Sequence, residues 1–169
     1  LRAPTAGPVI PASAALDAAD PLTADSAPAV ADTHRDRVLG EQRALKEFLA
    51  KRFRIAHGAV ESFVEAAYRS GFEHRVDPLL VLAVAAVESR FNPVAESARG
   101  ARGLMQVLPK YHQDKLAAHG GDDALLDPVV NIDVGTRILR DYIRRGGSLR
   151  SGLGLYSGAS EESLSQYAD

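Results

Sequence analysis

Nine consecutive apolar residues, Leu79 to Val87, are followed directly by Glu88. Asp77-Pro78 stands before this run, which gives a helix start: the aspartate caps the first turn and proline occupies its first position. The run is too short to cross a bilayer, which takes about 20 apolar residues. It predicts a helix from Pro78 to about Arg90, buried on every side at the centre of a domain.

Glu88 would lie on the same helix face as Val84 and Ala85, four and three residues before it. Burial disfavours an ionised carboxyl group, and so does the negative end of the helix dipole, so both raise its pKa. A carboxyl group that stays protonated near neutral pH can act as a general acid. A surface ion pair with Arg90 or Arg102 is the alternative role, and helix position alone does not decide between the two.

The chain from Thr33 onward has helical periodicity throughout, and several period-two strands with hairpin turns are not found. We therefore predict an all-α fold. Further helices are expected after a cap at Asp32 or Thr33, from Ala59 to Ser70 with Gly71 as the stop, after Pro109, from Pro128 to about Arg145, and from Ser148 to Tyr156.

Residues 1–32 have a different composition, with 11 Ala, 5 Pro and 4 Asp. They carry too little apolar area to offset the entropy of ordering them, so we predict a flexible or disordered tail before a domain at 33–169. Because the chain begins at Leu1, we expect a processed or truncated product whose signal peptide lies outside it. Residues 160–167 have the pattern of a capped first helical turn, so we expect a closing helix to be missing.

Several chemistries are disfavoured. The absence of cysteine excludes disulfides, thiolate catalysis and cysteine-based zinc sites, and a net charge of −2 disfavours a nucleic-acid partner. The five histidines form no His-x-x-x-His pair, so we expect no metal and no cofactor. We expect His57 and His74 at helix ends, and His112 and His119 on a polar face.

A glycine-punctuated loop, Ser97 to Gly103, follows the apolar helix and leads into the apolar run Leu104 to Leu108, which Gln106 interrupts. Glycines let a backbone approach a ligand closely. A buried glutamine needs hydrogen-bond partners, which either a ligand or the backbone of the neighbouring turn can supply. Beside a buried glutamate, this loop favours a neutral, hydroxyl-rich ligand.

These segments resemble the soluble lytic transglycosylase family. The first motif runs from Glu88-Ser89-Arg90-Phe91-Asn92-Pro93 through Ser97 to Gly100-Ala101-Arg102-Gly103-Leu104-Met105-Gln106-Val107-Leu108-Pro109 and is highly specific. Asp127-Pro128, Asn131-Ile132 and Gly135 are similar to the second motif. Leu155-Tyr156-Ser157-Gly158-Ala159 matches the third only loosely, since the family usually has Ala-Tyr-Asn-Ala-Gly. The resemblance covers residues 76–159, about half of the chain.

The resemblance implies a lysozyme-like helical domain with a groove for peptidoglycan strands. It implies cleavage of the β-1,4 bond between N-acetylmuramic acid and N-acetylglucosamine without water, leaving a 1,6-anhydromuramic end. Glu88 would be the acid and then the base. By the same resemblance, Ser97 and Gln106 would bind the sugar, Tyr156 would orient Glu88 through its hydroxyl, and Met105 and Leu108 would form the groove floor or wall.

Two alternatives remain open. A goose-type lysozyme-like hydrolase using two carboxylates needs a second acid, for which Glu96 and Asp114 are nearest in sequence. A non-catalytic module for peptidoglycan binding or envelope assembly would keep only the groove. We expect a monomer in the periplasm or cell envelope, with a tether or envelope partner for the tail left open. Internal or terminal cleavage, and the effect of Ser157, are not determined by the sequence.

Overall fold

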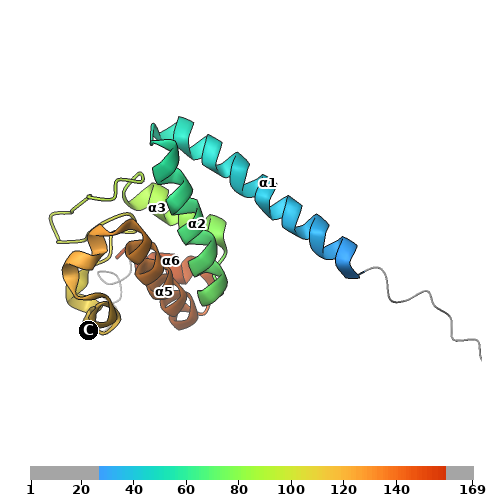
Figure 1. The fold of residues 1–169 in the computed structure, drawn as a ribbon. Helices are drawn as coiled ribbons and strands as arrows, with labels where there is room; N and C mark the ends of the chain where they lie inside the picture. The colour runs from blue at the N-terminus through green and yellow to red at the C-terminus, as the bar shows by residue number, and fades with distance from the viewer. Residues whose placement is uncertain (1–26, 159–169) are drawn as a thin grey trace, which may run out of the picture. The chain divides into compact units, whose positions relative to one another are not determined.

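The computed structural model describes residues 27–158, with side chains described from residue 35 onward. Within this part of the chain there is no strand, which confirms the all-α prediction (Figure 1). No helix described there is both long and apolar enough to cross a membrane. The elements are α1 Ala27–Phe53, α2 His57–His74, α3 Pro78–Glu88, η1 Pro109–Tyr111, α4 Gln113–Leu116, η2 Ala117–His119, η3 Asp122–Leu126, α5 Pro128–Gly146 and α6 Leu149–Tyr156.

α1 starts earlier than predicted. It is already helical at residue 27 and runs through Asp32 and Thr33, so neither residue begins it. The alanine-rich sequence before Thr33 favours helix, which explains the earlier start. The chain divides into two units, residues 1–38 and 39–169, and the boundary falls inside α1. The site described below lies in the second unit, while the expectations for residues 1–26 and 160–167 fall outside the described residues.

The two aspartate–proline helix starts are confirmed. The Asp77 carboxylate accepts a 2.8 Å hydrogen bond from the backbone N–H of Leu79 at the start of α3. Asp127 accepts from the backbone N–H groups of Val129 and Val130, at 2.8 and 3.2 Å, at the start of α5. Both caps therefore fix where the two helices of the site begin.

Gly71 does not end α2, which continues to His74 and closes at Arg75 in a left-handed conformation. The glycine instead allows close approach, because a Cβ there would lie 2.7 Å from the Val76 carbonyl oxygen and 3.0 Å from the Pro78 ring. Gly71 thus lets the connection to α3 pass directly over α2.

α3 is buried on one side only. Val81, Leu82, Val84 and Ala85 are buried, whereas Leu79 and Val87 are 43% and 81% exposed. The prediction of burial on every side was therefore wrong for the face that carries these two residues. The reason lies in packing: within residues 39–158, α2 covers the inner face of α3 and leaves the outer face uncovered.

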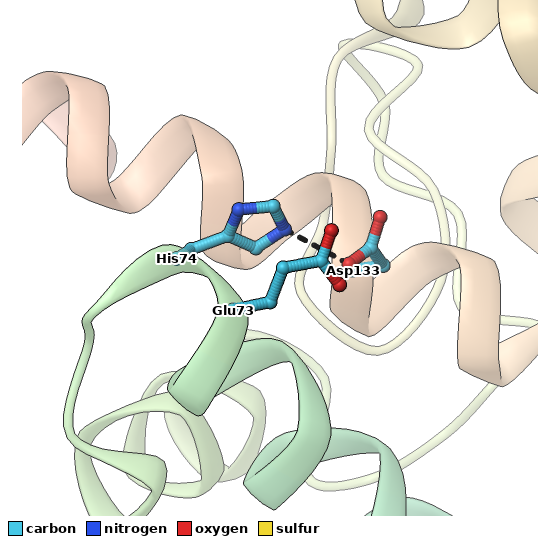
Figure 2. Close-up of side chains that lie close together, drawn as sticks. All are labelled: Glu73, His74 and Asp133. Atoms are coloured by element: carbon cyan, nitrogen blue, oxygen red, sulfur yellow. Dashed lines mark hydrogen bonds and ion pairs between the residues drawn. The ribbon is translucent and has the colours of Figure 1, made fainter.

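α5 is the centre of the packing, since it contacts both α2 and α6 (Figure 1). Polar side chains join α2 to α5 (Figure 2). The His74 ring nitrogen Nε2 lies 2.9 Å from the Asp133 Oδ1, and the Ser70 hydroxyl donates to the same oxygen at 3.1 Å. α5 is thus fastened to α2 by these polar contacts and also packs against α6.

Candidate active site

Glu88 is the last residue of α3, and the chain reverses directly after it. The Ser89 hydroxyl donates a 2.7 Å hydrogen bond to the Leu104 carbonyl oxygen and approaches the Ala85 carbonyl oxygen at 3.1 Å. These contacts fasten the later loop to the end of the helix. The carboxyl group consequently sits at the junction of α3 and the loop.

Phe91 anchors this reversal. Arg90 and Phe91 both have positive φ, 54° and 62°, a strained conformation for residues with side chains. The buried Phe91 ring stacks on Phe63 at 6.2 Å and meets the edge of Phe53 at 5.0 Å. Aromatic packing of this kind offsets the backbone strain and fixes the exit of the chain from α3.

The loop from Ala95 to Leu108 is held by its own backbone. The Arg102 N–H donates to the Val107 carbonyl oxygen at 2.9 Å, and the Val107 N–H donates to the Arg102 carbonyl oxygen at 3.0 Å. The Gly103 N–H donates to the Ala95 carbonyl oxygen at 2.9 Å. Gly103 has a positive φ of 75°. A Cβ at this position would overlap the Asn131 side chain, so only glycine fits here.

Asn131, fully buried in the first turn of α5, ties the loop to that helix. Its Oδ1 accepts a 2.7 Å bond from the Met105 N–H. Its Nδ2 donates to the carbonyl oxygens of Arg102 and Leu125, at 2.9 and 3.0 Å. One amide side chain thereby bonds three backbone groups, and it is the partner of the Met105 N–H and the Leu125 carbonyl, whereas the Arg102 carbonyl also accepts from the Val107 N–H.

A cleft opens above these supports, and Glu88 is its only carboxylate within the described residues. Burial raises the pKa of Glu88 above its ordinary value. Neither alternative ion pair is formed among the described residues: Glu88 has no ion pair with Arg90, and Arg102 instead contacts Glu96 and Asp123, at 3.7 and 3.2 Å. The lining residues are Glu88, Ser97, Arg99, Ala101, Gln106, Val107, Leu108, Tyr111, His112, Ile138, Tyr142, Leu155, Tyr156, Ser157 and Gly158.

Ser97, Gln106 and Leu108 line the cleft, and the binding of a sugar by Ser97 and Gln106 stays a prediction. The Ser97 Oγ accepts a 3.0 Å bond from the Ala101 N–H, and its own hydrogen has no acceptor among the described residues. The Gln106 Nε2 donates to two backbone carbonyl oxygens, those of Ala95 and Gly103, at 3.1 and 3.0 Å. The neighbouring turn therefore satisfies the amide nitrogen, and the amide oxygen is left as an acceptor for a ligand.

Met105 does not line the cleft, contrary to the expectation that it forms the floor or wall. Its side chain is fully buried and packs against Gly135, where a Cβ would lie 2.6 Å from the Met105 Sδ. The physical reason is the Asn131 bond to its backbone N–H, which holds Met105 over α5. Met105 contributes its carbonyl oxygen instead, which accepts a 2.8 Å hydrogen bond from the Tyr156 hydroxyl.

Tyr156 lines the cleft beside Glu88, but its hydroxyl proton is donated to Met105 and not to Glu88. Burial is the main cause that raises the pKa of Tyr156, with the Glu88 charge as a further cause. The hydroxyl consequently stays protonated at neutral pH. That Tyr156 orients Glu88 remains a prediction.

Neither candidate for a second acid faces the cleft. Glu96 is exposed and pairs with Arg102. Asp114 is exposed and pairs with Lys115 at 3.1 Å. The described cleft therefore offers one carboxyl group.

Residues far from Glu88 in sequence complete the opposite wall. Tyr142 of α5 meets Tyr156 and His112 edge to face, at 6.2 and 6.1 Å. His112 was expected on a polar face; it is instead half-buried in the cleft, and burial followed by Lys115 lowers its pKa. Tyr142 was missed because nothing local in α5 indicates which chain segment faces it.

One cluster outside the cleft has the residue types of a metal site. Glu73, His74 and Asp133 bring three donor atoms within 4.8 Å of one another, and Figure 2 shows the Glu73 carboxylate beside Asp133. The Asp133 Oδ1 already contacts two partners, Ser70 and His74. The adjoining depression is also lined by positive charges that oppose a cation: Arg75, Arg140 and Arg144. We interpret the cluster as a junction between α2 and α5.

Comparison with known proteins identifies a family. A sequence model of the family described as "Transglycosylase SLT domain" matches residues 61–162. A "Membrane-bound lytic murein transglycosylase C" of Actinobacillus pleuropneumoniae serotype 5b (strain L20) is 41% identical over 80 residues, covering 42% of this chain and 22% of that protein. A "Soluble lytic murein transglycosylase" of Escherichia coli (strain K12) is 33% identical over 111 residues, covering 63% and 16%.

A viral protein is also similar. A "Transglycosylase" of Enterobacteria phage PRD1 is 34% identical over 90 residues, which cover 53% of this chain and 32% of the phage protein. The aligned parts thus span about a third or less of each of these three relatives.

Proposed function

This chain belongs to the transglycosylase SLT domain family, and from that premise we propose that it cleaves the glycan strands of peptidoglycan as a lytic transglycosylase. The bond cut is the β-1,4 linkage between N-acetylmuramic acid and N-acetylglucosamine. The product carries a 1,6-anhydromuramic end because no water enters the reaction.

The single carboxyl group of the cleft supports this chemistry. A reaction through one group that first gives and then takes a proton needs only Glu88, whereas hydrolysis by paired acids needs a second carboxyl across the bond. Within the described cleft Glu88 has no such partner. Its raised pKa favours the protonated form from which the first step starts.

The proposed reaction has two steps. Glu88 protonates the glycosidic oxygen, the bond from the muramic C1 to that oxygen breaks, and its electron pair stays on the departing N-acetylglucosamine. The N-acetyl oxygen of the muramic residue stabilises C1 meanwhile. The Glu88 carboxylate then takes the proton of the 6-hydroxyl as its oxygen bonds to C1, which regenerates the acid.

The surrounding groups suit a sugar substrate. The Ser97 hydroxyl hydrogen and the Gln106 amide oxygen are available to the hydroxyl and acetamido groups of a sugar. Aromatic and apolar side chains, among them Leu108 and Tyr142, offer faces for the sugar rings. We propose that the protein acts in the cell envelope, where this polymer lies; its monomeric state and any tether or partner of the tail remain predictions.

Digestion of purified peptidoglycan followed by mass spectrometry of the soluble fragments tests the function. Anhydro ends are the expected product. Reducing ends, each heavier by one water, would replace the proposal with hydrolysis. Pull-down of glycan without release of fragments would identify a binding module instead.

A further inference from the structure

Arg99 is a cleft residue to which neither the family motif nor the proposed mechanism gives a role. Within the described residues it and Glu88 are the only cleft-lining side chains that ordinarily carry a full charge at neutral pH. Its side chain is exposed and has neither an ion pair nor a hydrogen bond in that part of the chain. The guanidinium is solvated and therefore available to a ligand.

The neighbouring basic side chains are occupied, in contrast to Arg99. Arg102 contacts Glu96 and Asp123. Lys115 contacts Asp114 and Asp141, at 3.1 and 3.5 Å. The Lys110 ammonium lies over the ring of Tyr111, 4.6 Å from its centroid. The acidic side chains of this region thus pair with Arg102 or Lys115 and not with Arg99.

Arg99 is held at the tip of a closed turn. The Gly100 N–H donates to the Ser97 carbonyl and the Ser97 N–H donates to the Ala101 carbonyl, both at 2.9 Å. The Ala101 N–H also donates to the Ser97 hydroxyl at 3.0 Å. Three hydrogen bonds across five residues fix the Arg99 backbone on the cleft wall, so less ordering is required when the side chain binds.

Arg99 does not act as the partner of Glu88. A guanidinium close to a carboxyl group lowers its pKa, whereas the pKa of Glu88 is raised and burial alone accounts for it. No ion pair joins the two side chains within the described residues, so the Arg99 guanidinium is available to another group.

We propose that Arg99 binds a carboxylate of the substrate, which makes it a specificity-determining residue of the cleft. This inference rests on the proposed function. The planar guanidinium matches a carboxylate with two parallel hydrogen bonds. The N-acetylated sugars of peptidoglycan are neutral, so its carboxylates come from two sources: the stem peptides, or the lactyl group of muramic acid where the peptide has been removed.

Binding in an inactive background separates this inference from the proposed activity. Glu88→Gln and the double variant Glu88→Gln/Arg99→Gln are compared by co-sedimentation with intact strands, with strands stripped of peptides, and with strands whose carboxyl groups are converted to methylamides. Arg69→Gln in the same background is the matched control, since Arg69 is exposed on α2 and lines no described pocket.

Arg99→Gln should weaken binding to carboxylate-bearing strands about five- to tenfold, as expected for a charge-assisted pair at a partly exposed site. Methylamidation should weaken binding of the Arg99-containing protein equally and leave the Arg99→Gln variant unaffected. Loss confined to intact strands identifies the stem peptide, and loss confined to stripped strands identifies the lactyl carboxylate.

The proposal is overturned if Arg99→Gln and Arg69→Gln bind alike, or if Arg99→Gln lowers affinity equally for methylamidated strands. Arg99→Lys keeps the positive charge but cannot make the two parallel hydrogen bonds of a guanidinium, so it should recover only part of the affinity. Failure of the wild-type protein to release fragments would contradict the proposed function alone, because these binding comparisons need no turnover.

Discussion

The hydroxyl of Tyr156 donates a 2.8 Å hydrogen bond to the carbonyl oxygen of Met105, 51 residues earlier in the chain. This bond joins the end of α6 to the loop that carries Gln106, and it closes one end of the cleft. The hydroxyl that the family resemblance assigned to Glu88 thus has a backbone partner. Its first contribution is to hold two walls of the site together.

Tyr156→Phe should lower the free energy of unfolding by about 1–2 kcal/mol, because the Met105 carbonyl loses its side-chain donor in a partly buried place. Urea denaturation measures the change. Tyr111→Phe is the matched control: Tyr111 also lines the cleft but is exposed and has no hydrogen bond through its hydroxyl within the described residues, so its effect should stay within about 0.5 kcal/mol. Equal stability of the two variants would contradict a contribution from the Tyr156 bond.

Glu88→Gln should reduce fragment release from peptidoglycan by about 100-fold or more, because the amide cannot transfer the proton. Circular dichroism should show an unchanged fold. Glu96→Gln and Asp114→Asn remove the other two carboxyl groups considered and should keep nearly full activity, since both lie outside the cleft. Strong loss in either control would mean that a second acid takes part.

The pH dependence of kcat/KM should follow Glu88. The first step needs the protonated acid, so activity should fall as pH rises through the pKa of Glu88. Because burial raises this pKa, the fall should lie above the pH at which an ordinary glutamate ionises. If kcat/KM instead falls at the pH where an ordinary glutamate ionises, the Glu88 carboxyl group is not desolvated in the free enzyme, and the assignment is contradicted.

The free energy of unfolding should also depend on pH through Glu88, in a direction that the raised pKa fixes. The folded state binds the Glu88 proton more tightly than the unfolded state, so this contribution is present below the unfolded pKa and is lost as pH rises through the folded pKa. Glu88→Gln removes the titrating carboxyl group, and with it this loss of stability at higher pH. Urea titrations over the window should therefore give a smaller decline in stability for the variant than for the wild type, and parallel declines would contradict the assignment.

Asn131→Ala should destabilise the fold by about 2–4 kcal/mol, because the Met105 N–H and the Leu125 carbonyl lose their partner and the Arg102 carbonyl loses one of its two hydrogen bonds. Asn92→Ala is a suitable control, since the Asn92 side chain caps only the exposed N–H of Val94, at 3.2 Å. Thermal and urea denaturation compare the two. A loss near 1 kcal/mol for Asn131→Ala would mean that water replaces the amide and that the loop does not depend on it.

Gly103→Ala and Gly100→Ala form a matched pair. Both glycines have positive φ, 75° and 82°, so each alanine carries about 1 kcal/mol of backbone strain. A Cβ at Gly103 would in addition overlap the Asn131 amide, whereas a Cβ at Gly100 has no neighbour within 4 Å. Gly103→Ala should therefore be the more destabilising by at least about 2 kcal/mol. Equal effects would show that the loop moves away without cost.

Local chemistry in the sequence determined the starts of α3 and α5 and the position of the acid. Asp77-Pro78 and Asp127-Pro128 carry their own cap and fixed backbone angle, so α3 and α5 begin where the sequence predicts. Glu88 was found because it ends an apolar run, and burial raises its pKa as predicted. Local signals sufficed here because each involves contacts within a few residues.

The tertiary structure decided which side chains meet across the chain. The burial of Met105, its bond to Tyr156 and the presence of Tyr142 and His112 in the cleft depend on how the loop lies against α5, through the hydrogen bonds of Asn131. The exposed face of α3 was equally hidden from the sequence, because an apolar residue has the same local pattern whether or not another element covers it. Contacts between distant segments are set by packing, and packing is a property of the whole domain.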